Sequence, residues 1–224
     1  MSLLVRQSLS LPDDVDANLE ALYKEIDWLT LVIDQVIRSY FKQEGHERSW
    51  QDIPVPDLNP ATSVYANAVF QWSLNTYARL GLALVLAPHI RPESLDVFFG
   101  VNSIYERSFS EFGGVSDKTF SGFLPTGQTL YFLICANDPN YRTQVMDILN
   151  ANHVLMAEQV LSLQSAEDSL PAISGVLSLS DQWLHYFLTG EKVRPELNSA
   201  FPAHPITTPQ DWEDLILDYS VMGQ

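Results

Sequence analysis

The sequence predicts a mostly helical α+β fold: an N-terminal helical hairpin, then a winged-helix-like domain and an extended connector. Three observations support this prediction. Apolar residues recur at spacings of three and four through most of the first 90 residues. Glycines and short apolar runs replace that pattern beyond residue 95, and prolines interrupt it again beyond residue 190. We therefore expect three regions, 1–94, 95–190 and 191–224.

The first predicted element is a long amphipathic helix that begins after LPDD, with Asp13 or Asp14 as its N-cap. Three acidic residues recur seven apart on its polar face, at Glu20, Asp27 and Asp34. Because charged side chains routinely cover the solvent face of such a helix, we interpret them as solvated rather than as metal ligands. The apolar positions of the helix are Val15, Leu19, Leu22, Tyr23, Ile26, Leu29, Ile33, Val36, Ile37 and Tyr40.

A second helix is predicted from Tyr65 to Val85, ending before Pro88, because the residue before a proline disfavours the helical conformation. The proline-rich segment EGHERSWQDIPVPDLNP separates it from the first helix. A loop of about 15 residues can return the chain beside itself, so we expect the two helices to pack antiparallel as a hairpin.

Shorter elements follow a stretch with five glycines between Gly100 and Gly127. Ser180 is a predicted N-cap and Gly190 a predicted C-terminal stop for the last of these elements. The order helix, helix, strand, loop, strand is that of a winged-helix unit, with SAEDSLPA as the wing. The predicted elements are helices over 125–136 and 141–150, a helix-to-strand segment over 154–164, a strand over 173–180 and a helix over 180–190.

The charge of the chain restricts its partners. Twelve Lys and Arg stand against 28 Asp and Glu, which gives a formal net charge of −16. Nucleic acids and anionic membranes are bound chiefly through Lys and Arg, so we expect neither as a partner. Residues 141–190 contain Arg142 as their single Lys or Arg, which also disfavours a DNA-reading winged helix. A basic protein or peptide is the expected partner.

Residues 122–129, GFLPTGQT, match the phosphate-binding pattern G-x-x-x-x-G-K-[ST] except that Gln128 replaces the lysine. That lysine supplies the charge that neutralises a bound triphosphate. The preceding SDKTFS is polar rather than a buried strand, Lys118 precedes the loop, and Pro125 stiffens it. We interpret the segment as a proline and glycine turn that starts a helix.

Other residue types indicate no catalytic, cofactor-binding or metal-binding residue. The five histidines, at positions 46, 89, 153, 185 and 204, form no H-x-x-x-H pair, and no G-x-S-x-G motif is present. For His185, in the aromatic segment WLHYF, the preferred interpretation is a hydrogen-bonded core histidine, and the alternative is a hydrogen bond at an interface. Cys135 is the single cysteine and lies in the apolar run LYFLICA, so it is expected in the core and cannot form an internal disulfide.

The expected location is the cytoplasm. A single cysteine suits a reducing compartment, the longest apolar stretch is Leu80–Ala87, and the N-terminus lacks a long apolar core. Among the aromatic residues, Trp28, Trp72 and Trp183 are expected in the core. For Phe201 and Trp212, which flank the connector, burial and docking onto a following module remain equal alternatives.

Four segments carry a resemblance to a known family: EFGG (111–114), FLPTGQT (123–129), LTG (188–190) and PELNSAFPAHPITTPQDWEDLIL (195–217). From about residue 95 to 217 the chain resembles the region just upstream of the ATPase module in bacterial AAA-family ATPases that carry an N-terminal winged-helix domain. The resemblance implies that the P-loop, the acidic Mg²⁺ motif and ring assembly belong to a module beyond Gln224. ATP and Mg²⁺ are then expected in the full-length protein, and no catalytic residue maps onto this chain.

Two hypotheses follow. The first is a non-catalytic N-terminal region that recruits or gates partners for an AAA ATPase. The alternative is a free-standing winged-helix-like protein that binds other proteins or acts in transcription. A hydrolase that uses Asp211, Glu213 and Asp214 is disfavoured, because neighbouring helical residues point in different directions and no histidine is near them in the sequence.

Overall fold

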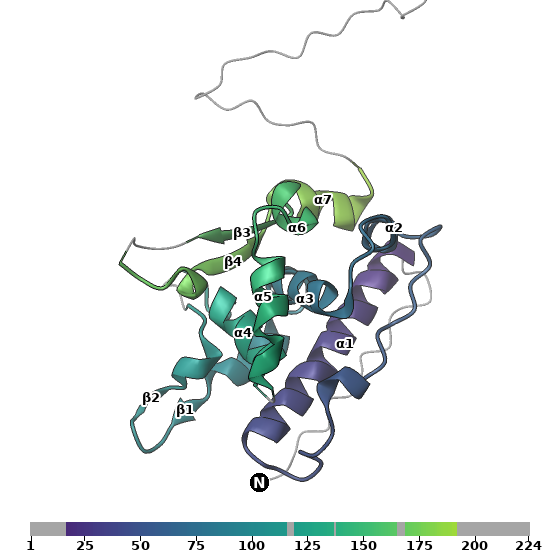
Figure 1. Ribbon diagram of the computed structural model, residues 1–224. Helices are drawn as coiled ribbons and strands as arrows, with labels where there is room; N and C mark the ends of the chain where they lie inside the picture. Colours follow the sequence, from purple (N-terminus) through teal and green to yellow (C-terminus); the bar gives the residue numbers. More distant parts are fainter. Residues whose placement is uncertain (1–16, 116–118, 137, 165–168, 192–224) are drawn as a thin grey trace, which may run out of the picture. The chain divides into compact units, whose positions relative to one another are not determined.

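The computed structural model describes residues 17–115, 119–136, 138–164 and 169–191, all within one unit of the chain. Helices dominate this part of the chain, and two short antiparallel sheets accompany them (Figure 1). The predicted mostly helical α+β fold is confirmed. Among the residues described, no helix is long and apolar enough to cross a membrane. The predicted connector, the helix after it and the N-cap at Asp13 or Asp14 lie outside the described residues.

Helix α1 (Ala17–Tyr40) follows the predicted apolar stripe and buries it. Its polar face carries ion pairs one turn apart: Lys24 Nζ lies 2.7 Å from Glu20 Oε1, and Arg38 Nε lies 2.7 Å from Asp34 Oδ2. Such exposed pairs contribute only about 0.3–0.5 kcal/mol each. The prediction of a solvated acidic face is therefore confirmed, and burial of the apolar stripe is what stabilises this helix.

The prediction of one second helix is wrong, because the chain forms α2 (Val64–Gln71) and α3 (Thr76–Ile90) instead. Ser73 adopts a left-handed conformation with φ of +50°, which ends α2, and the Asn75 side chain caps the start of α3. Helix α3 also continues through Pro88. Pro88 lies in the last turn, and because it has no N–H the Leu84 carbonyl loses the helical hydrogen bond that position 88 would otherwise supply.

A β-hairpin follows the helices. The 3₁₀ helix η2 (Pro92–Phe99) leads into β1 (Val101–Asn102), which pairs antiparallel with β2 (Arg107–Ser108). A second 3₁₀ helix, η3 (Ser110–Phe112), returns the chain to the core, where Phe112 is buried. In Figure 1 the hairpin extends away from the surrounding helices.

The elements beyond residue 119 confirm the predicted order of helices and strands. Gly190 ends the last helix with φ of +76°, as predicted. The winged-helix identity itself stays a prediction. The elements are α4 (Gly127–Cys135), η4 (Pro139–Tyr141), α5 (Arg142–Ile148), α6 (Val154–Ala157), β3 (Leu161–Gln164), η5 (Ala172–Ser174), β4 (Val176–Leu179) and α7 (Asp181–Thr189).

Strands β3 and β4 form a ribbon, and the residues that precede α4 extend it. Leu161 pairs with Leu179, and Gln164 pairs with Val176. On the other side of β4, the Leu177 N–H donates to the Pro125 carbonyl at 2.9 Å. The Gly127 N–H donates to the Gly175 carbonyl at 3.1 Å. The start of α4 is therefore fixed by backbone hydrogen bonds to the ribbon.

One hydrophobic core contains side chains from both sides of residue 95. The ring of Tyr40, at the end of α1, lies 5.3 Å from that of Phe132 in α4. The ring of Tyr65 in α2 lies 5.3 Å from that of Phe187 in α7. Each edge-to-face pair adds about 0.5–1.5 kcal/mol to the burial of its rings. The division after residue 94 stays a prediction, and side-chain packing crosses it.

Asn18, in the first turn of α1, connects three helices through its buried amide. Its Oδ1 accepts hydrogen bonds from Ser63 Oγ at 2.8 Å and from the Val64 N–H at 3.0 Å, at the start of α2. Its Nδ2 donates to the carbonyl of Phe187 in α7. Because each buried polar group has a partner, this contact avoids a desolvation penalty and positions the helix ends.

Candidate functional site

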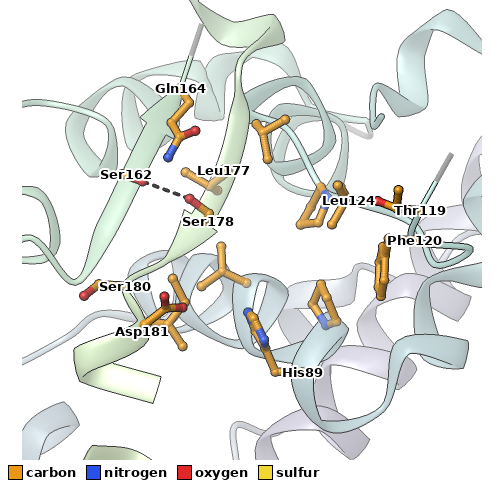
Figure 2. Close-up of a pocket in the computed structure, with 15 residues that line it drawn as sticks. His89, Thr119, Phe120, Leu124, Ser162, Gln164, Leu177, Ser178, Ser180 and Asp181 are labelled. Atoms are coloured by element: carbon orange, nitrogen blue, oxygen red, sulfur yellow. Dashed lines mark hydrogen bonds between the residues drawn. The ribbon is translucent and has the colours of Figure 1, made fainter. Parts of the chain in front are cut away.

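A groove of about 740 Å³ lies between the C-terminal part of α3 and the β3–β4 ribbon (Figure 2). Three separated parts of the sequence form it, and both polar and apolar side chains line it. Its lining combines Val85, Pro88 and His89 of α3, Thr119, Phe120, Leu124 and Pro125 of the segment before α4, and Ser162, Gln164, Val176, Leu177, Ser178, Leu179, Ser180 and Asp181 of the ribbon and the start of α7.

The ribbon supplies hydrogen-bonding groups to the groove. Ser162 and Ser178 are cross-strand neighbours, and their hydroxyl oxygens lie 2.8 Å apart (Figure 2). Gln164 lies two residues along β3, on the same face, because side chains alternate along a strand. Leu177 and Leu179 occupy the alternate positions of β4 and are buried. This pattern gives the ribbon one polar face and one face in the core.

His89 is the titratable group in the last turn of α3 that lines the groove. Burial lowers its pKa below the ordinary value of 6.5, and the negative charge of Asp181 opposes that shift. The imidazole is therefore mostly neutral at pH 7 and can both donate and accept a hydrogen bond. The described residues that line the groove include no Lys, Arg or Cys.

The segment that resembles a P-loop forms the capped start of α4 in this structure. Thr126 caps α4: its Oγ1 accepts from the Thr129 N–H, and Thr129 Oγ1 accepts from the Thr126 N–H. The Gly127 N–H is bonded to Gly175, and a Cβ at position 127 would lie 2.7 Å from the Ile173 carbonyl oxygen. Gln128 Nε2 donates to the Glu111 carbonyl. These hydrogen bonds occupy the Thr126, Gly127 and Thr129 amides, which agrees with a turn that starts a helix.

Cys135 is buried as predicted, and burial raises the pKa of its thiol to about 11. A thiol that stays protonated is a poor nucleophile and a poor metal ligand. The core interpretation of His185 is wrong, because the side chain is exposed, and the interface alternative stays a prediction. Phe187, two residues later, takes the buried position of α7. Trp28 is buried, whereas Trp72 and Trp183 are half-buried and stack edge to face at 5.1 Å.

The remaining candidates from the sequence are not brought together by the described residues. Within the described ranges, no three His, Cys, Asp or Glu side chains form a group that could hold a metal ion. Lys118, Phe201, His204 and Trp212, and the acidic residues at 211, 213 and 214, lie outside those ranges.

The sequence interpretation missed a buried ionic network in the helical core. Glu25 of α1 is fully buried, accepts a hydrogen bond from Tyr65 Oη at 3.1 Å and pairs with Arg79 of α3. Arg79 Nη2 also donates to the Pro56 carbonyl at 3.0 Å. Burial raises the pKa of Glu25, against the opposing effects of Arg79 and Tyr65. A signal was present, because Glu25 falls between Leu22 and Ile26 within the apolar stripe of the helix.

No family model, curated protein or solved structure matches this chain. The resemblance to the region upstream of AAA-family ATPase modules therefore stays an expectation, and the candidate site has to be judged by its own geometry.

Proposed function

We propose that this chain is a non-catalytic region that binds a segment of a partner protein. The observation that carries this proposal is the composition of the groove beside the β3–β4 ribbon. The groove offers hydroxyl, amide and imidazole groups next to apolar side chains, a combination that suits a polypeptide. The described lining contains no cation to hold a phosphate and no Cys, and Asp181 would repel anions.

The groove also lacks the arrangement that nucleophilic catalysis requires. The Ser162 and Ser178 hydroxyls bond to each other, and within the described part of the chain no hydrogen bond joins His89 to either of them. An activated serine needs a base that accepts its proton. Binding without chemistry is therefore the function that these contacts support best.

The place of this region in a larger protein rests on the sequence resemblance alone. In that proposal the chain is the partner-recruiting N-terminal region of an AAA-family ATPase, and ATP, Mg²⁺ and ring formation belong to a following module. The alternative is a free-standing protein-binding or transcription-related protein. A salt titration of DNA binding separates the transcription version, because phosphate contacts weaken steeply with salt.

Two measurements test the proposal. Calorimetry with Mg·ATP and a steady-state hydrolysis assay on residues 1–224 should show neither binding heat nor turnover; either signal contradicts a non-catalytic region. A photo-crosslinking amino acid at position 164, in the groove, should give a protein adduct in an extract of the source cells. The matched control is the same amino acid at position 146, which is exposed outside the groove.

The protein in the adduct then has to be identified and purified. That protein should bind the wild-type chain, and Ser178→Arg, which fills the groove with a long side chain, should weaken binding. Equal adducts at positions 164 and 146, or equal affinity for the Ser178→Arg chain, would contradict the groove as the binding site.

A further inference from the structure

Exposed large apolar side chains are concentrated in one stretch of the chain, which runs from the end of η2 to the turn of the β1–β2 hairpin. Of twelve such residues in the described part of the chain, five lie within residues 97–105. Ile104 is 81% exposed and Tyr105 is 68% exposed, both at the turn of the hairpin. Scattered exposed apolar residues are normal, but contiguous ones mark interaction sites. The five are Val97, Phe99, Val101, Ile104 and Tyr105.

The hairpin holds this apolar tip in a defined conformation. Asn102 Oδ1 accepts hydrogen bonds from the Ile104 N–H at 2.9 Å and from the Tyr105 N–H at 3.3 Å. The guanidinium carbon of Arg107 lies 5.8 Å from the centre of the Tyr105 ring. A side chain that is already positioned loses less conformational entropy when a partner binds. The two most exposed apolar side chains of the tip are therefore presented on an ordered turn.

The acidic charges that flank the tip in the sequence indicate the kind of partner. Between residues 93 and 111 the chain has four acidic residues, and Arg107 is the one Lys or Arg. Glu106, next to Tyr105, has φ of +52°, a conformation that glycine or asparagine adopts with less strain. The tip therefore carries a carboxylate at a position where the backbone favours another residue. The acidic residues are Glu93, Asp96, Glu106 and Glu111.

We infer that the hairpin tip docks into an apolar pocket rimmed by Lys or Arg on a partner protein. The apolar side chains of Ile104 and Tyr105 would fill the pocket, and Glu106, beside Tyr105 in the turn, would face the basic rim. A second copy of this acidic chain would repel the tip, as would an anionic membrane. The inference rests on the proposed protein-binding function but uses other residues, since none of the groove-lining residues belongs to the hairpin.

The test is selection of a phage-displayed random peptide library on the full chain. We expect enriched peptides that combine apolar residues with Lys or Arg. Fluorescence anisotropy should show that the double variant Ile104→Ser/Tyr105→Ser weakens their binding roughly tenfold or more, as for loss of aromatic anchors. Binding should also weaken in about 0.5 M NaCl, because salt screens the charges. The matched control Met146→Ser removes an equally exposed apolar side chain elsewhere and should leave binding unchanged.

Each other outcome contradicts the inference. Peptides that bind the double variant as well as wild type would leave a protein-binding function in place and remove the hairpin from it. Enriched peptides without basic residues would overturn the assigned chemistry. A hairpin-dependent dimer in sedimentation experiments would show that the tip binds a second copy. Failure to enrich any peptide would count against the hairpin, whereas Mg·ATP turnover would count against the proposed function. Unchanged circular dichroism and thermal midpoint exclude unfolding of the double variant.

Discussion

Glu25→Ala is expected to destabilise the protein strongly, because it leaves the buried Tyr65 hydroxyl without its acceptor and Arg79 without its ion-pair partner. Tyr65 is fully buried and donates its hydroxyl to Glu25, and the Arg79 guanidinium pairs with the same carboxylate. Removing one partner of a buried ion pair costs about 3–5 kcal/mol. Arg79 keeps a hydrogen bond to the Pro56 carbonyl, so we expect the lower end, about 3 kcal/mol.

Urea unfolding followed by the fluorescence of the buried Trp28 and Trp50 measures this loss. The control is the double variant Glu25→Leu/Arg79→Met, which removes both charges and retains apolar volume. It should be more stable than Glu25→Ala, because an apolar pair of similar volume often replaces a buried ion pair without loss. The reasoning would be refuted if the free energy of unfolding of Glu25→Ala lay within about 0.5 kcal/mol of the wild-type value, which is the range of ordinary surface substitutions.

The pH dependence gives a second readout of the same residue. Burial raises the pKa of Glu25 above its ordinary value of 4.5, so the folded state binds this proton more tightly than the unfolded state does. As pH rises from about 4.5 through the pKa in the folded protein, wild type should lose stability relative to Glu25→Gln, which does not titrate. A relative gain in stability over that window would show that Arg79 outweighs burial.

Three further predictions concern the remaining groups. Because burial raises the pKa of the Cys135 thiol to about 11, native protein at pH 8 should react with Ellman's reagent only after unfolding. In an NMR titration, the pKa of His89 should lie below 6.5, and Asp181→Asn should lower it further by removing the opposing charge. Gly127→Ala should lower the free energy of unfolding by about 1–3 kcal/mol, because its Cβ would lie 2.7 Å from the Ile173 carbonyl oxygen; an unchanged midpoint in urea would show that the turn adjusts freely.

The sequence predicted those elements whose signals are local. The apolar spacing of α1 and the glycine at position 190 both give a pattern within a few residues, and the structure confirms them. The break between α2 and α3 depends on Ser73, a non-glycine residue in a left-handed conformation, which composition does not reveal. The prediction that the helix ends before Pro88 was also wrong. A proline disfavours the helical conformation nearby, but it does not fix the residue at which a helix ends.

The candidate site was not predictable in the same way, because it depends on which distant segments meet. His89, Phe120 and Ser178 come from three parts of the chain, and no spacing rule connects them. The interpretation of GFLPTGQT used only local features, namely the missing lysine, the polar SDKTFS with Lys118 before the loop, and Pro125, and it agrees with the observed contacts of Gly127 and Gln128. His185 was misplaced because the aromatic residues around it were read as a core segment, whereas Phe187 alone is fully buried there.

The link from Asn18 to the Phe187 carbonyl joins residues 169 positions apart in sequence. During synthesis on the ribosome, α1 therefore emerges long before Phe187, whose carbonyl accepts the hydrogen bond from Asn18, has been made. The contact between the rings of Tyr65 and Phe187 likewise cannot form until Phe187 has been made. Contacts of such long sequence separation slow folding, since the loop between them must close first. The nascent chain therefore exposes apolar surface until α7 has been made. During that interval it is most prone to aggregation.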